Sequence, residues 1–201
     1  METIIHIGII VCILAYFTIY LRGILAGKVK PVLATWLFLS LAVVISFVTN
    51  FHQTGLSGVS ANFFNLADSF AVIAIFVIIL FRKDTRRSFN LFEKWCIAIV
   101  IAMLVMWLIS GSDIVTHLAI QLILVIAYLP SLVKLWHAKV NTESLGTWIF
   151  DCLASALGLI LPIMQADTLP IVYGLRSVIS TLLMFVFIVR LKLKYPSVHG
   201  N

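Results

Sequence analysis

Seven apolar runs of about twenty residues, joined by short polar connections, dominate this 201-residue chain. A helix needs about 20 mostly apolar residues to cross the hydrocarbon core of a bilayer, so each run is long enough to span a membrane. Charged residues, proline, glycine and asparagine set the ends of the runs. The expected spans are 4–21, 31–49, 63–81, 92–110, 115–133, 146–164 and 170–190.

The composition leaves little room for anything besides these spans. Apolar residues make up 62% of the chain and charged residues 11%, whereas a soluble domain has about 45–50% apolar and roughly 25% charged residues. Seven spans of about 20 residues use most of the chain, which excludes a separate soluble or nucleotide-binding domain. The sequence therefore predicts an all-α polytopic membrane protein with seven transmembrane helices.

Basic residues lie almost entirely on one side of the expected membrane. The net charge is +6, and 13 of the 14 lysine and arginine residues, Lys83, Arg86 and Arg87 among them, fall in or beside alternate connections; Arg176 is the exception. Cytoplasmic connections are enriched in such residues, so the N-terminus is expected outside and the C-terminus in the cytoplasm, in a bacterial inner membrane. The basic residues form no single stripe, so they do not indicate nucleic-acid binding.

An internal repeat appears when the chain is compared with itself at a shift of 112 residues. Nine of the 28 positions from Ala15 to Ala42 are then identical, and they include Thr35-Trp36 over Thr147-Trp148. The same shift places the third span over the seventh, so each copy contains three helices. The expected division is a first repeat at 1–81, a linker with the fourth helix at 82–112 and a second repeat at 113–201.

The unmatched fourth helix makes the two copies parallel, because three helices alone would leave the next copy inverted. Parallel repeats around an axis along the membrane normal are one plan of transporters, with the solute site near the midplane between the copies. The 3+1+3 arrangement therefore favours a transporter, while a receptor or scaffold with the same fold stays open because a fold alone does not fix function.

The segment Ala127-Tyr-Leu-Pro-Ser-Leu-Val-Lys134, with Glu143-Ser-Leu-Gly-Thr-Trp148 after a short loop, is similar to the pattern of the PQ-loop proteins, the group that contains the SWEET sugar transporters. That family has a Pro-Gln pair where this chain has Pro130-Ser131 and Thr18-Ile19. The resemblance implies alternating access between two three-helix bundles. It is compatible with a sugar, a nucleoside-like or an amino-acid-like solute.

Three charged residues stand out well inside the expected spans, where each one requires a partner or a wet cavity. Asp68 and Arg176 are five and six residues into their spans, so we expect them at matching depth, facing each other across the repeat axis. They would form an outer gate or hold a polar solute, and a static ion pair that fixes packing is the alternative. Asp151, five residues into the sixth span, would close the inner end, relay a proton or reach the interface through water.

Other polar residues within the spans are candidates for the same solute path. Each could instead make an interhelical hydrogen bond worth about 0.6 kcal/mol. The candidates are Asn65, Ser69, Gln121, Ser155, Ser177 and Thr181.

Pro130 and Pro162 each remove a backbone hydrogen bond within a span, so we expect them to act as hinges and the second copy to move more than the first. Trp36 and Trp148 lie near the cytoplasmic ends of their spans, where aromatic residues commonly anchor a helix at the membrane interface.

Several other functions are not favoured. The last span has no lysine for a retinal, no nucleophile and base align at one depth for an enzyme, and no Gly-rich motif indicates ATP. Cys12, Cys96 and Cys152 are single, so neither a disulfide nor a metal site is expected, and no cofactor is expected. The expected partners are the lipid bilayer and a small-molecule solute, and a homo-oligomer is compatible with this fold. A seven-helix ligand-binding receptor without flux is the main rival.

Overall fold

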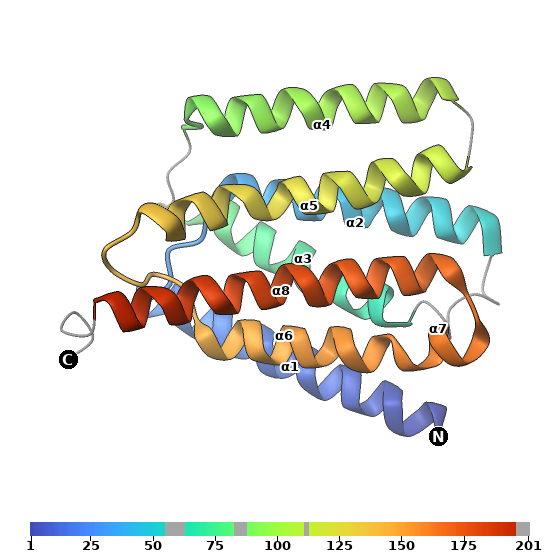
Figure 1. Ribbon diagram of the computed structural model, residues 1–201, viewed down its shortest axis with the longest axis horizontal. Helices are drawn as coiled ribbons and strands as arrows, with labels where there is room; N and C mark the ends of the chain where they lie inside the picture. Colours follow the sequence, from blue (N-terminus) through green and yellow to red (C-terminus); the bar gives the residue numbers. More distant parts are fainter. Residues whose placement is uncertain (55–62, 83–87, 111–112, 196–201) are drawn as a thin grey trace.

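The computed structural model describes residues 1–54, 63–82, 88–110 and 113–195 (Figure 1). Lys83, Arg86 and Arg87 of the basic connection lie outside these residues. The described ranges contain no strand, which confirms the all-α prediction. The helices are α1 (Glu2–Leu25), α2 (Leu33–Thr54), α3 (Phe63–Phe81), α4 (Leu91–Ser110), α5 (Asp113–His137), α6 (Leu145–Gly158), α7 (Ile160–Gln165) and α8 (Thr168–Lys194).

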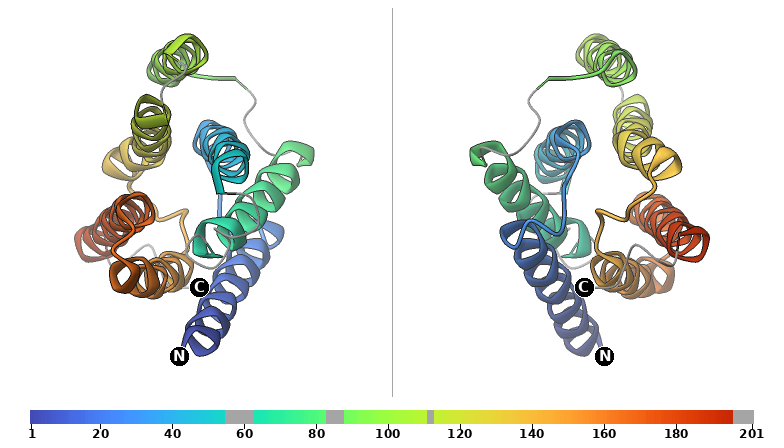
Figure 2. Two further views of the ribbon diagram at one scale, coloured as in Figure 1. Left: turned by 90° about the vertical axis from the view of Figure 1, so that its right-hand side faces the viewer. Right: turned by 90° about the vertical axis from the view of Figure 1, so that its left-hand side faces the viewer.

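Six of the helices pack into a closed ring. Around the ring α1 packs on α6, α6 on α8, α8 on α5, α5 on α2, α2 on α3 and α3 on α1. The end-on views in Figure 2 show this order, with α4 outside the ring against α5. Residues that face the centre of the ring are therefore supplied by both halves of the chain.

Helix lengths and outer surfaces are those of a polytopic membrane protein. The segments Glu2–Leu25, Phe63–Phe81, Ala119–His137, Leu145–Gln165 and Pro170–Lys194 are long and apolar enough to cross a membrane, and Leu33–Ser46 is a shorter apolar helix. Large apolar side chains such as Leu14, Phe70, Leu108 and Ile179 are more than half exposed on the outside. Exposed apolar surface of this extent suits contact with lipid chains.

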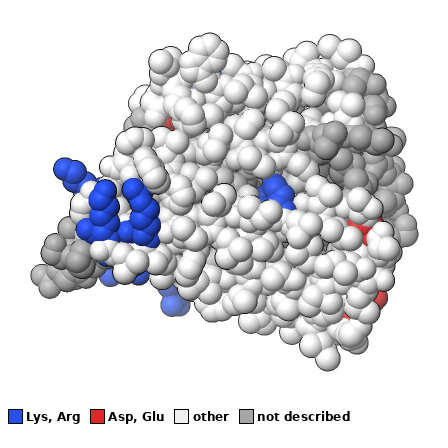
Figure 3. Space-filling view, viewed as in Figure 1, with Lys and Arg blue, Asp and Glu red and all other residues white. Residues whose placement is uncertain are grey.

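Lysine and arginine side chains gather at one end of the molecule, where α8 finishes (Figure 3). We call this the basic end. Arg22 lies in the last turn of α1, Lys134 in that of α5, and Lys192 and Lys194 in that of α8. Both α5 and α8 extend beyond the ends predicted for their spans, because cations are favourable at helix C-termini and long side chains reach out of an apolar layer.

The predicted sixth span is divided into α6 and α7. Pro162 has no N–H to donate to the carbonyl of Gly158, four residues before it, and the helix is interrupted at Leu159. Pro130 has a different outcome, because it lies inside α5 and the helix continues to His137. The two prolines thus leave one broken helix and one continuous helix in the second half of the chain.

Gly158 lets α3 approach α6 closely. A Cβ atom added at Gly158 would lie 2.6 Å from Cβ and Cγ of Phe64, closer than side-chain atoms pack. Phe64 has little room to move, because its side chain is buried and its ring packs edge-on against the Tyr173 ring at 5.9 Å between centroids. The contact requires a residue without a side chain at this position.

Gly158→Ala is therefore expected to lower the free energy of unfolding by about 1–3 kcal/mol, as overpacking of a filled site does. Gly146→Ala is the matched control in the same helix, since its Cβ would lie at an ordinary 3.6 Å from Ile19 Cδ1. Alanine also favours the helix relative to glycine. Thermal unfolding of both variants in detergent measures their losses of stability. Equal losses in Gly158→Ala and Gly146→Ala would contradict the prediction.

Candidate functional site

A cavity of about 20 Å³ lies at the centre of the ring, which is room for about one water molecule. Every ring helix contributes to its wall, and α4 and α7 do not. We call it the central cavity. Its polar and aromatic lining residues are Tyr16, Trp36, Asp68, Tyr128, Trp148, Asp151, Tyr173, Arg176 and Ser177.

The structure brings together the three charged residues that the sequence singled out. Asp68 on α3, Asp151 on α6 and Arg176 on α8 all line the central cavity. The span positions alone place Asp151 nearer the opposite end of the membrane from the other two. Besides their other neighbours, α3 and α6 also contact each other, with Gly158 at the end of α6 against Phe64 at the start of α3.

Two of these charges have defined partners. The Tyr16 hydroxyl donates a hydrogen bond to Asp68 Oδ1 at 2.5 Å. Arg176 Nε donates to Gln121 Oε1 at 3.1 Å, and its guanidinium carbon lies 4.7 Å from the centre of the Tyr173 ring. In the described part of the chain no direct ion pair joins Asp68 to Arg176, although each feels the other's charge.

Most of the other polar candidates do not line the central cavity. Asn65 Nδ2 donates to Ser46 Oγ at 2.9 Å, and Ser69 Oγ donates back to the Asn65 carbonyl at 2.6 Å. Thr181 Oγ1 donates to the Ser177 carbonyl at 3.0 Å. These bonds lie within or between helices, which is the alternative that the sequence left open, although Asn65 Oδ1 has no hydrogen-bond partner in the described part of the chain.

Ser177 and Gln121 support the site in different ways. Ser177 lines the central cavity, and its hydroxyl lies 2.8 Å from that of Ser155, so α8 is joined to α6 beside Asp151. Ser155 also donates to the Asp151 carbonyl at 2.8 Å. Gln121 on α5 holds the Arg176 side chain rather than facing the cavity.

The two tryptophans that the repeat aligns, Trp36 and Trp148, are not interface anchors. They are 4% and 3% exposed and line the central cavity. Side chains so buried in protein do not reach the lipid headgroups. Trp95 and Trp136, at 64% and 53% exposed, are tryptophans placed on the outer surface.

Three tyrosines are functional candidates that the charge and polarity of the spans do not indicate. Tyr16, Tyr128 and Tyr173 come from α1, α5 and α8 and are all buried in the cavity wall. Tyr16 and Tyr128 are identical positions in the 112-residue alignment, so the repeat does contain a signal for them. Tyr173 has no such signal, because the equivalent position in the first copy is an alanine.

A second polar group lies between the central cavity and the basic end. Trp36 Nε1 donates to the Tyr20 hydroxyl at 3.2 Å, and Tyr20 donates to Glu143 Oε2 at 3.2 Å. Lys134 Nζ lies 3.6 Å from Glu143 Oε1 and donates to the Lys30 carbonyl. We call Tyr20, Trp36, Lys134 and Glu143 the basic-end cluster; it ties α1, α2 and α5 to the loop before α6.

A larger cavity, of about 620 Å³, lies at the basic end between α2, α4 and α5. It shares no lining residue with the central cavity. Of the predicted path and hinge residues only Pro130 lines it. The chemistry that the sequence pointed to is therefore in the small cavity rather than in the large one.

Comparisons of the chain with protein-family models, with curated proteins and with solved structures gave no match.

Glu143 should give the stability of the protein a specific pH dependence. Burial raises the pKa of its carboxyl above the ordinary 4.5, and the Lys134 ammonium opposes that rise. The folded state then binds this proton more tightly than the unfolded state. The protonated carboxyl group therefore contributes fully to the free energy of unfolding below pH 4.5, and this contribution is lost as the pH rises through the raised pKa.

Glu143→Gln removes this titration while keeping the shape of the side chain. As the pH rises above 4.5, the melting temperature of the native protein is expected to fall relative to that of the variant. Thermal unfolding in detergent across the acid to neutral range measures it. A difference that does not change with pH would refute the assignment.

Proposed function

We propose that the protein is a membrane transporter that moves a small polar solute by alternating access between two three-helix bundles. The observation that carries this proposal is the central cavity. It lies in the middle of the ring, and charged and aromatic side chains from both halves of the chain line it. A static scaffold gains nothing from two carboxylates and a guanidinium at this depth, where they are costly.

Packing within each half supports the 3+1+3 repeat. In the first half α3 packs on both α1 and α2, and in the second half α8 packs on both α5 and α6. Between the halves, α1 packs on α6 and α2 on α5, which are equivalent pairs when the halves are exchanged. The fourth helix stands outside this scheme, as the linker of a parallel repeat does.

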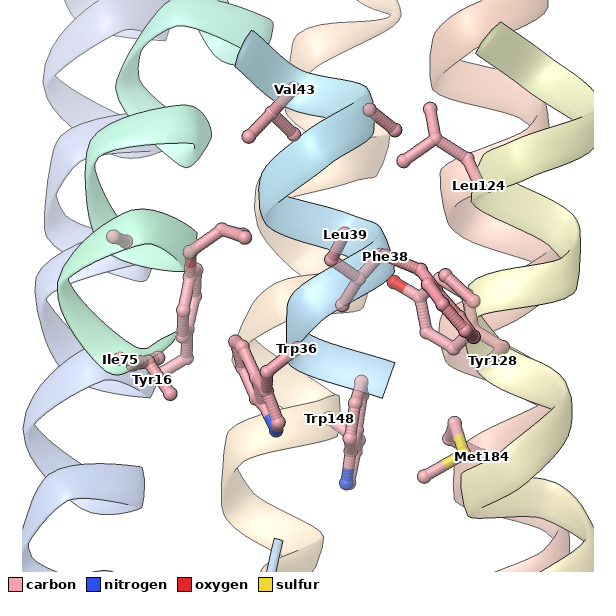
Figure 4. Packing of buried hydrophobic residues seen from close by; sticks show 14 of the residues in the cluster. Tyr16, Trp36, Phe38, Leu39, Val43, Ile75, Leu124, Tyr128, Trp148 and Met184 are labelled. Carbon is pink, nitrogen blue, oxygen red and sulfur yellow. The ribbon is translucent and has the colours of Figure 1, made fainter. Parts of the chain in front are cut away.

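Positions 112 residues apart also meet around a common axis. Tyr16 and Tyr128, Trp36 and Trp148, and Leu39 and Asp151 are equivalent pairs whose members all line the central cavity. A two-fold rotation about the membrane normal does not reverse a direction along that normal. Equivalent side chains related by such an axis therefore point towards the same end of the molecule. In Figure 4 the nitrogens of Trp36 and Trp148 both point towards the end at which α2 begins.

The connections at the basic end meet at equivalent positions as well. The Lys30 amide donates to the Thr142 carbonyl at 3.0 Å, and these residues are 112 apart in the sequence. Contact between equivalent residues is expected only close to a two-fold axis. We propose that the axis passes here, with the basic end in the cytoplasm, the N-terminus outside and a bacterial inner membrane as the location.

Solute passage requires the ring to open, because the central cavity holds about one water molecule. The basic-end cluster closes one side, and its release would open the cavity towards the basic end. Pro130 within α5 and the break before Pro162 are the proposed hinges, both in the second half. These features agree with the PQ-loop and SWEET-like plan that the sequence resembles.

A buried hydroxyl pair tests the repeat directly. Thr35 Oγ1 lies 2.9 Å from Ser131 Oγ, and both side chains are buried. The equivalent of Thr35 is Thr147, and the equivalent of Ser131 is Ile19. Thr147 Oγ1 accordingly has no hydrogen-bond partner in the described part of the chain.

Thr35→Val is expected to lower the free energy of unfolding by about 1–3 kcal/mol, because it leaves the Ser131 hydroxyl without a partner. Thr147→Val should be neutral or stabilising, since it replaces a buried unsatisfied hydroxyl by a methyl group of similar size. Melting temperatures of both variants in one detergent make the comparison. Equal losses of melting temperature in Thr35→Val and Thr147→Val would contradict the equivalent positions assigned to the two repeats.

Transport itself is tested by counterflow into liposomes that contain the purified protein. Asp68→Asn and Arg176→Gln are each expected to lower uptake of a transported solute about tenfold or more, the effect of losing about 1.4 kcal/mol of binding free energy. Their melting temperatures should change little, because both residues face the cavity. Asn65→Leu is the control on α3, since Asn65 bonds to Ser46 and does not line the cavity.

Unaltered uptake by Asp68→Asn and Arg176→Gln, with lowered melting temperatures, would assign these residues a static role in packing. Solutes that bind without any counterflow would favour the receptor over the transporter.

A further inference from the structure

The charges that line the central cavity do not balance. Asp68 and Asp151 are acidic, and Arg176 is the basic residue of the lining. With all three ionised the wall carries one net negative charge inside a low-dielectric ring. A membrane interior strongly disfavours such an excess, which either a proton on one carboxyl group or a cationic solute offsets.

Asp151 is the carboxylate of the wall that has no hydrogen-bond partner in the described part of the chain. Asp68 accepts the Tyr16 hydroxyl, and Arg176 is held by Gln121 and Tyr173. Within the part of the chain that the structure describes, the Asp151 carboxylate has no hydrogen bond or ion pair, although it feels the charges of both Asp68 and Arg176. It is thus the acceptor in the wall that is free to receive a ligand.

Aromatic rings stand beside Asp151. Trp148 lies one helical turn before it, and the centroids of the Trp148 and Tyr128 rings are 6.0 Å apart at 60° between their planes. Trp36 lines the same cavity from α2. A cation within about 6 Å of an aromatic face is attracted to it, most strongly where water is excluded. Arg176 over the Tyr173 ring shows that the same wall already holds one cation in this way.

We propose that the solute is a small organic molecule with one net positive charge, whose cationic group binds to the Asp151 carboxylate between the rings of Trp148 and Tyr128. This inference rests on the proposed transport function and narrows its substrate class. A neutral solute leaves the negative charge in place, and an anion adds to it. A monocation brings the total charge of the wall and solute to zero.

Solutes matched in shape but not in charge provide the test. Arginine is compared with citrulline, lysine with norleucine, and methylguanidinium with methylurea, first by thermal shift on the purified protein and then by counterflow in liposomes. Ligands that bind the folded state raise its melting temperature. At least one cation is expected to raise it and to exchange at least about ten times faster than its neutral partner, which corresponds to about 1.4 kcal/mol.

Variants locate the binding group. Asp151→Asn is expected to weaken binding of that cation about tenfold or more, while Asp151→Glu retains most of it because the charge remains. Asp167→Asn is the matched control, since Asp167 caps the start of α8 and does not line the cavity. If Asp151→Asn does not fold, the comparison of each cationic solute with its neutral partner on the native protein still tests the inference.

Each outcome bears on the inference. Neutral partners that bind and exchange as well as the cations overturn it and leave the transport function standing. Cations that bind through Asp151 but do not exchange support it and overturn the transport function. The absence of binding by every cation overturns it.

Discussion

The ring of helices depends on one constraint, which is that a charge inside a bilayer requires a partner or a wet cavity. Asp68, Asp151 and Arg176 meet this constraint because six helices bring them to one cavity. The tyrosine and glutamine partners of Asp68 and Arg176 come from α1 and α5. The packing of the ring and the placement of these charges therefore depend on each other, since neither Asp68 nor Arg176 could be accommodated on a single lipid-facing helix.

The halves of the ring are similar in packing and different in chemistry. Leu39 occupies the place in the first half that Asp151 occupies in the second, and Phe64 occupies that of Arg176. Phe64 fills its side of the ring by packing against Gly158 and Tyr173. The first half thus has apolar residues at the two positions where the second half has Asp151 and Arg176, although Asp68 gives the first half a carboxylate of its own. In the transporter that we propose, the two halves therefore do not contribute equally to solute binding.

The sequence locates the helices and their charged residues, but it predicts poorly the depth of Asp151 and the orientation of side chains around the helix axis. Apolar runs locate the helices, and charge within those runs is enough to identify Asp68, Asp151 and Arg176. The prediction for Trp36 and Trp148 is wrong because a position near a helix start suits an interface anchor equally well, and only packing against Tyr20 and Tyr128 decides that they face inward.

The burial of Glu143 could not be predicted from the sequence, for a different reason. A glutamate in a short loop is ordinarily solvated, whereas here α1 and α5 cover it and it is 5% exposed. Its burial depends on contacts between segments far apart in the chain, with Tyr20 on one side and Lys134 on the other. Local patterns of charge and hydropathy do not contain such contacts.

Trp36 gives the two sites a physical connection. Its ring lines the central cavity, and its nitrogen donates to Tyr20, which in turn donates to Glu143. A solute that displaces the Trp36 ring would disturb the orientation of Tyr20 and so weaken the contact that holds Lys134 and Glu143 together. The hydrogen-bonded chain is short and buried, so movement at one end has few ways to relax before it reaches the other. In the transporter that we propose, occupancy of the cavity and closure of the basic end are linked through Trp36, as an alternating mechanism requires.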